Sequence, residues 1–67
     1  MTIPEKIRAA RIAANLTQKQ LGVQAGYPES AAQGIVGRWE AGTRPVPVEK
    51  LRIVAKLLKL TIDDLVP

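Results

Sequence analysis

The chain of 67 residues contains no histidine and no cysteine, the side chains that most often serve as catalytic bases, nucleophiles and soft metal ligands. Its adjacent carboxylates, Asp63 and Asp64, follow Thr61 in a helix-capping pattern that already accounts for them. No glycine-rich run matches a phosphate-binding loop. The remaining polar side chains can form hydrogen bonds and ion pairs. We therefore expect no enzymatic activity, no cofactor and no metal.

The charge balance indicates what such side chains could recognise. Ten Lys and Arg residues stand against six Asp and Glu residues, which gives a formal net charge of +4 and a pI near 10.0. A basic surface of this kind favours a polyanionic partner, although many basic proteins bind none. Charge alone therefore leaves nucleic acid as one possibility among several.

Length and composition predict one small domain over residues 1–67. Hydrophobic residues make up 46% of the chain, but Tyr27 and Trp39 are the only aromatic residues, so the core must be aliphatic. Without cysteine, stability must come from compact helix packing. No apolar run reaches the ~18 residues of a membrane span, and the N-terminus has no signal-peptide pattern. We expect a soluble, cytoplasmic protein with no membrane partner.

Two capping patterns predict where the first two helices begin. Thr2 stands three residues before Glu5, and Thr17 stands three residues before Gln20. In a capping box, the Thr side chain and the Glu or Gln side chain each bond the other residue's backbone N–H. Gly26 can end the second helix in a left-handed conformation.

Gly22 falls in the middle of that second helix. A glycine there costs roughly 1 kcal/mol relative to alanine. Its presence favours a close crossing by another helix at this point, since only a residue without a Cβ lets two backbones approach closely.

A third helix is predicted from about Ser30 to Ala41, with Gly42 at its C-terminal cap. Its inward stripe consists of Ala32, Val36 and Trp39. A loop over 43–47 contains two prolines. Apolar residues at spacings of three and four then predict a fourth helix, namely Val48, Leu51, Val54, Ala55 and Leu58. A final short turn begins at Thr61, so five short helices and no strand result.

In this order, the residues resemble the lambda-repressor-like or Cro-like family of helix-turn-helix regulators. The matching positions are Ile7, Arg8, Arg11, Leu16, Thr17, Gln18, Leu21, Trp39, Glu40, Gly42, Leu51, Ala55, Leu58, Asp64 and Leu65. The resemblance covers nearly the whole chain. It implies an all-α bundle of five short helices in which the third helix reads double-stranded operator DNA. One departure is that Trp39 follows Gly26 by several residues more than this family commonly shows.

The resemblance assigns base contacts to the third helix at Ser30, Gln33, Gly34 and Arg38. Gln33 can pair bidentately with adenine, and Arg38 can pair with guanine or bind a phosphate at the groove edge. The alternative for Arg38 is a surface ion pair with a carboxylate. For Gln33 the extra residues leave the register open. Gly34 and Gly37 either let the backbone approach DNA closely or are tolerated defects in the helix.

Phosphate contacts are expected on either side of this helix. The start of the second helix, at Thr17, Gln18 and Lys19, presents free backbone N–H groups and a positive dipole end. The matching Gln of the family binds phosphate. Gln18 could also brace the first exposed residue of the third helix, and Lys19 could be only a solvated lysine. Thr43 and Arg44 fall in the loop where family members contact the DNA backbone.

Other residues are assigned to the architecture. Arg11 and Glu40 match positions that form an ion pair in the family. Trp39 is expected in the core, where its indole N–H needs a hydrogen-bond partner.

Two functions fit these observations. The first is a sequence-specific transcription regulator, a small repressor or its DNA-binding domain, acting as a homodimer on half-sites ~34 Å apart. The second is a protein-interaction module, antitoxin-like or a coregulator domain, on the same scaffold. Clustering of Lys19, Arg38 and Arg44 would favour the first, and an apolar patch around Tyr27 and Ile35 the second. Candidates for a dimer interface are Ile12, Ile53, Val66 and the final helix.

Overall fold

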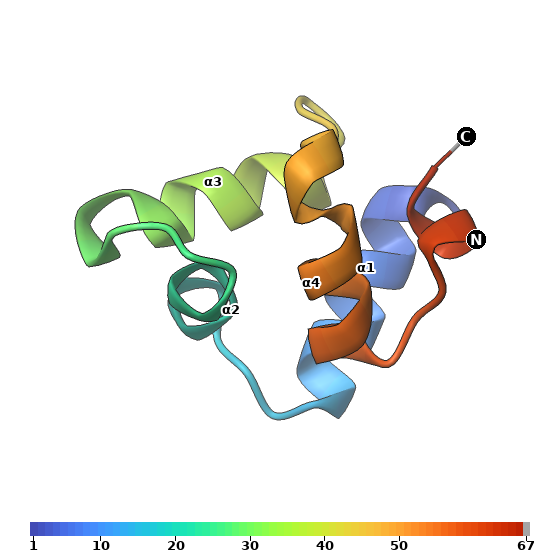
Figure 1. Cartoon of the computed structure of the whole chain (residues 1–67), viewed down its shortest axis with the longest axis horizontal. Coiled ribbons are helices and arrows are strands. Elements are labelled where there is room, and N and C mark those ends of the chain that lie inside the picture. The colour runs from blue at the N-terminus through green and yellow to red at the C-terminus, as the bar shows by residue number, and fades with distance from the viewer. Residues whose placement is uncertain (67) are drawn as a thin grey trace.

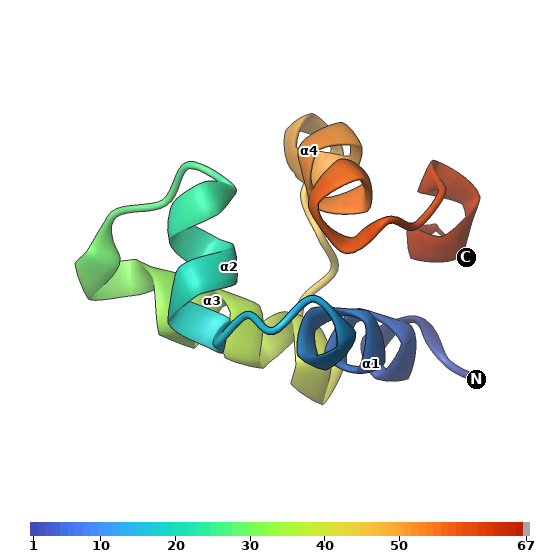
Figure 2. The ribbon, with the colours of Figure 1, turned by 90° about the horizontal axis from the view of Figure 1, so that it is seen from below.

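A computed structural model of the protein describes residues 1–66. Four α-helices and one 3-10 helix follow each other along the chain: α1 (Ile3–Ala13), α2 (Gln18–Gln24), α3 (Glu29–Ala41), α4 (Val48–Leu58) and η1 (Ile62–Leu65). The described part of the chain contains no strand, so the expected all-α fold of five short helices is confirmed. The N-terminus and η1, the last element described, lie at the same end of the molecule (Figures 1 and 2).

The capping boxes form at the predicted positions. Thr2 Oγ1 accepts a hydrogen bond from the Glu5 N–H at 3.4 Å, and Glu5 Oε1 accepts from the Thr2 N–H at 3.0 Å. The same reciprocal pair joins Thr17 and Gln20, at 3.0 and 2.8 Å. Each box satisfies two backbone donors that a helix start leaves free. The beginnings of α1 and α2 are therefore set by local sequence.

The close crossing predicted at Gly22 is present. Helix α2 lies across α3 (Figure 2), and a Cβ placed on Gly22 would come within 2.6 Å of Ala32 Cβ and 2.7 Å of the Ala32 carbonyl oxygen. No real Cβ tolerates such distances to a backbone. The glycine is thus required for the close crossing of α2 and α3.

The core is aliphatic except for the indole of Trp39. The buried hydrophobic residues are Ile7, Leu21, Ala25, Ala32, Val36, Trp39, Val46, Val54, Ala55, Leu58 and Leu65. The predicted inward stripe of α3, Ala32, Val36 and Trp39, is confirmed, with exposed fractions of 0–1%. Because this face is fixed by packing, the opposite face of α3 is presented to solvent.

One helix boundary and one predicted buried position differ from the sequence-based expectation. Helix α3 begins at Glu29 rather than at Ser30, and its N-cap is Pro28, whose side chain forms no capping bond. The Pro28 carbonyl accepts from the Ala32 N–H at 2.9 Å, so the fixed φ of proline starts the helix. Val48 was expected in the buried stripe of α4 but is 82% exposed. It is the first residue of that helix, and the packed part of the stripe lies beyond it, at Val54 and Ala55.

Candidate nucleic-acid interface

The solvent face of α3 carries the four residues expected to contact bases. Ser30, Gln33, Gly34 and Arg38 are all exposed. Within residues 1–66, the side chains of Gln33 and Arg38 form no hydrogen bond or ion pair, so the carboxylate partner considered for Arg38 is not found there. Both side chains are therefore free to bond another molecule.

The two glycines of α3 lie in different surroundings. A Cβ on Gly34 would meet no atom within 4 Å, whereas a Cβ on Gly37 would lie 3.9 Å from the Gln18 amide, an ordinary van der Waals distance. Neither glycine is required by contacts within the protein. Gly34 is therefore explained either by the close approach of another molecule or as a tolerated defect in the helix.

The start of α2 lies beside α3 on one flank. An open hollow there is lined by Arg11, Leu16, Thr17, Gln18, Lys19 and Gln33. The structure thus brings all three expected phosphate contacts of α2 next to Gln33. Lys19 Nζ also lies 3.0 Å from Glu29 Oε1, and both side chains are more than half exposed. Such an exposed ion pair contributes little stability and is easily exchanged for another anion.

Gln18 has a different partner from the one considered. Its Nε2 donates to Glu40 Oε1 at 3.3 Å, near the end of α3, and not to the first exposed residue of that helix. The same carboxylate is held by Arg11, whose Nε lies 2.6 Å from Oε2 and whose Nη2 lies 3.2 Å from Oε1. Arg11 Nη1 donates to the Leu16 carbonyl at 2.8 Å. The structure therefore brings Arg11 and Glu40 together and links Gln18 to them.

The loop after α3 folds back on the helix end. The Thr43 N–H and Oγ1 donate to the Arg38 carbonyl at 3.1 and 3.3 Å, and the Arg44 N–H reaches the same oxygen at 3.4 Å. Thr43 and Arg44 are both exposed. Arg44 lines a second hollow together with Ile35, on the flank of α3 away from Gln33. Lys19 and Arg44 thus do not cluster together but stand on the two sides of the helix.

An aromatic pair lies on the Arg44 flank. The rings of Tyr27 and Trp39 meet edge to face, with centroids 5.9 Å apart and 63° between their planes. Lys50 Nζ lies 4.8 Å from the centroid of the Tyr27 ring, a cation–π arrangement. Burial, and then the Glu49 carboxylate, raise the pKa of the Tyr27 phenol above its ordinary value, against a smaller opposite effect of Arg44. The phenol is therefore protonated at neutral pH.

The same flank contains more than the apolar patch around Tyr27 and Ile35 that the sequence suggested. Tyr27, Ile35, Trp39, Arg44, Pro45 and Pro47 line one hollow of about 300 Å³. The indole N–H of Trp39, expected to need a partner, has none among residues 1–66. The contact of Lys50 with Tyr27 could not be predicted from the sequence, because it depends on how α4 packs.

Fold and interface define a helix-turn-helix domain, with α2 and α3 as the two helices. A family model described as helix-turn-helix matches residues 7–65. The chain is also 34% identical over 65 residues to the HTH-type transcriptional activator BcrR of Enterococcus faecalis, a match that covers 97% of this chain and 30% of the relative. This chain therefore spans less than a third of the length of that curated relative. No solved structure matches.

The chain belongs to the helix-turn-helix family of DNA-binding transcription regulators, which is not a family of enzymes. This assignment confirms the resemblance found in the sequence. Within residues 1–66, no helix has the length and apolar character needed to cross a membrane.

Proposed function

We propose that this domain binds operator DNA sequence-specifically, with α3 in the major groove, and that the bound domain represses transcription by occupying the site. The observation that carries the proposal is the placement of polar and cationic groups on both flanks of an exposed, unpaired helix face. Gln18 and Lys19 lie on one flank, and Thr43 and Arg44 belong to the loop at the other.

This placement suits a helix in a groove. The major groove is ~12 Å wide and is bordered by a phosphate backbone on each side. A helix seated in it needs anion-binding groups on both flanks and base-reading groups between them. The N-terminus of α2 supplies free backbone N–H groups for one backbone, and Arg44 supplies a guanidinium for the other.

Two side chains are proposed as the principal base readers. Gln33 and Arg38 are five residues apart, which separates them by ~140° around the helix and ~7.5 Å along it. Gln33 suits adenine and Arg38 suits guanine. Ser30 and Gly34 lie between them around the helix. Both residues are small, so the helix can approach the base edges closely.

Repression needs no surface beyond the DNA interface. A domain with extents of 28 × 22 × 20 Å that is bound to a promoter sterically blocks other proteins from the same DNA. Activation, the activity named for the relative in Enterococcus faecalis, requires a further contact with the transcription machinery. We further propose binding as a homodimer to two half-sites ~34 Å apart, through exposed apolar side chains such as Ile12 and Ile53.

The proposal is tested by selecting binding sites from random duplexes and titrating selected and random DNA at several salt concentrations. Arg38→Ala should cost ~1–3 kcal/mol on the selected site and relax preference at one base pair. Arg44→Ala should weaken binding to all sequences and reduce the salt slope by ~1. Arg52→Ala, exposed on α4, is the matched control and should change neither. Affinity that is independent of salt, or an Arg38→Ala variant indistinguishable from wild type, would contradict the proposal.

The protein-interaction alternative is favoured by two observations, the hollow that joins Tyr27 and Ile35 and the separation of Lys19 from Arg44. A specific protein interface commonly buries ~800 Å² on each partner. The six residues that line the hollow fall well short of the ~20–30 residues that each partner contributes to such an interface. DNA binding therefore remains the function that the interface supports best.

A further inference from the structure

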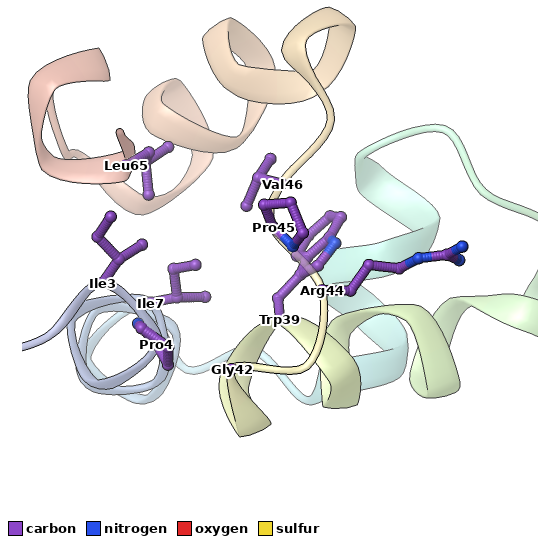
Figure 3. A pocket seen from close by; sticks show the side chains of 9 residues that line it. All are labelled: Ile3, Pro4, Ile7, Trp39, Gly42, Arg44, Pro45, Val46 and Leu65. Carbon is purple, nitrogen blue, oxygen red and sulfur yellow. The ribbon is translucent and has the colours of Figure 1, made fainter. Parts of the chain in front are cut away.

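The hollow on the Arg44 flank of α3 has features that the DNA interface does not use. Its walls come from three segments: Tyr27 of the α2–α3 turn, Ile35 and Trp39 of α3, and the loop residues Arg44, Pro45 and Pro47. It adjoins an apolar hollow, shown in Figure 3, in which Ile3, Ile7 and Leu65 face Val46, and the two hollows share Trp39, Arg44 and Pro45 as lining residues. Its volume of about 300 Å³ is at the lower end of the range for small-molecule sites.

A buried hydrogen-bond donor without a partner in the described part of the chain belongs to Trp39, one of the residues that line this hollow. Trp39 is 1% exposed, and its Nε1 has no acceptor among residues 1–66. In Figure 3 the indole nitrogen lies on the side of the ring toward Arg44, away from Ile3 and Ile7. A buried donor without an acceptor is energetically unfavourable. A ligand that supplied an acceptor to this atom would remove that cost, and its binding free energy would be more favourable.

The charged groups around the hollow are mainly cationic. Arg44 lines it and has no ion-pair partner within residues 1–66. Lys50 Nζ lies over the Tyr27 ring and would come within 2.9 Å of a Cβ on Gly26, so this ammonium stands at the rim. The Glu49 carboxylate is also near enough to act on Tyr27. Two cations against one carboxylate leave a net positive site.

We propose that this hollow binds a small organic carboxylate with an apolar body, such as an arylacetate or a branched aliphatic acid. The apolar body packs against Tyr27, Ile35 and Pro47. The carboxylate forms an ion pair with Arg44. Because Trp39 Nε1 is buried, one of the carboxylate oxygens accepts its hydrogen bond only when the side chains that cover this atom move on binding. Small size favours a free ligand over a segment of a protein partner, since a peptide backbone and its flanking residues would extend beyond the six lining residues.

Ligand binding would be coupled to DNA binding, and this step rests on the proposed function. Arg44 is the residue assigned to a DNA phosphate, and one guanidinium cannot fully pair with a phosphate and a carboxylate at once. The carboxylate therefore lowers the affinity for DNA, and DNA lowers the affinity for the carboxylate by the same factor.

The direct test uses the intact 67-residue chain without DNA. Trp39 is the only tryptophan, so the ¹H–¹⁵N spectrum contains one indole N–H resonance. Titration with phenylacetate should shift that resonance saturably. Phenylacetamide has the same shape and an acceptor oxygen but no charge to pair with Arg44, so it should bind at least tenfold more weakly. Arg44→Gln should weaken binding at least tenfold, and Arg52→Gln, the matched control on α4, should bind as the wild type does.

Several results would overturn the site. These are no saturable shift with phenylacetate, benzoate or 4-methylpentanoate, an equal shift with the amide, or equal losses in Arg44→Gln and Arg52→Gln. Binding of the peptide N-acetyl-Asp-Phe-amide without binding of any free acid would show that the occupant is a protein segment, and the proposal would be wrong.

The coupling is tested separately with selected DNA. Phenylacetate should weaken DNA binding of the wild type and leave the residual binding of Arg44→Gln unchanged. Unchanged wild-type affinity at saturating phenylacetate would refute the coupling but not the site. A protein that binds phenylacetate and selects no DNA sequence would refute the proposed function while the site is upheld.

Discussion

Arg11 and Glu40 join α1 to the last turn of α3 through an ion pair with 2.6 Å between Nε and Oε2, and their side chains are only 13% and 6% exposed. The Glu40 carboxylate also accepts from Gln18, and Arg11 also donates to the Leu16 carbonyl. One carboxylate therefore fixes α1, the start of α2 and the end of α3 relative to one another. The flank that we assign to phosphate binding depends on it.

Glu40→Gln should lower the free energy of unfolding by about 2–3 kcal/mol, because the guanidinium of Arg11, which is poorly exposed to water, loses its counter-charge. Denaturant unfolding at neutral pH measures this change. Glu49→Gln, which alters an exposed carboxylate on α4, is the matched control and should stay within ~0.5 kcal/mol of wild type. Equal effects of the two substitutions would mean that the Arg11 pair contributes no more than a surface charge.

Gly22→Ala should destabilise the fold although alanine is the better helix former. The added methyl would lie 2.6–2.8 Å from Ala32 atoms, two of them backbone atoms that cannot turn aside. Overpacking of this kind costs ~1–3 kcal/mol, against a gain of ~1 kcal/mol in helix propensity. Thermal unfolding followed by circular dichroism should show a lower Tm. A raised Tm would be incompatible with the close crossing of α2 and α3.

Local features could be predicted from the sequence because their causes are local. The capping boxes at Thr2 and Thr17 join residues three apart, and the buried stripe of α3 follows from helical period. Helix α3 starts one residue earlier than the sequence predicts because its N-cap is Pro28, a residue that has no capping side chain. Val48 fits the stripe by spacing, but spacing does not tell where a helix meets its neighbours.

The site was predictable only where the family resemblance reached. The Arg11–Glu40 pairing came from that resemblance, since no local rule relates residues in two helices 29 positions apart. Gln18 was placed beside α3, but its bond to Glu40 depends on how α2 and α3 cross. An apolar patch around Tyr27 and Ile35 was one expectation from the sequence, but the hollow itself depends on the packing of three chain segments and could not be predicted.

Stability should fall in acid through two capping carboxylates. Hydrogen bonds from the backbone and side chain of Thr2 lower the pKa of Glu5, and those of Thr61 lower the pKa of Asp64. A folded-state pKa below the unfolded value gives stability that is present above about pH 4 and is lost as the pH falls through the folded pKa.

Glu5→Gln and Asp64→Asn should therefore show a smaller loss of Tm than wild type between pH 5 and pH 2. Gln and Asn can still accept the capping bond but do not titrate in this range. Melting curves recorded at intervals of pH provide the measurement. If the doubly substituted chain lost as much Tm in acid as the wild type, the acid sensitivity would have to come from other carboxylates.

Gly34→Ala should separate the two explanations of the glycine on the solvent face of α3. No atom lies within 4 Å of the added methyl, so the substitution should stabilise the free protein by ~1 kcal/mol through helix propensity alone. If the glycine serves close approach to DNA, the same variant should bind selected DNA more weakly, and Gly34→Leu more weakly still. Ala9→Leu, on the exposed face of α1, controls for added apolar surface. A higher free energy of unfolding together with a lower affinity for DNA can arise only if DNA fills the space above Gly34 in the complex. An unchanged affinity for DNA would make the glycine a tolerated defect.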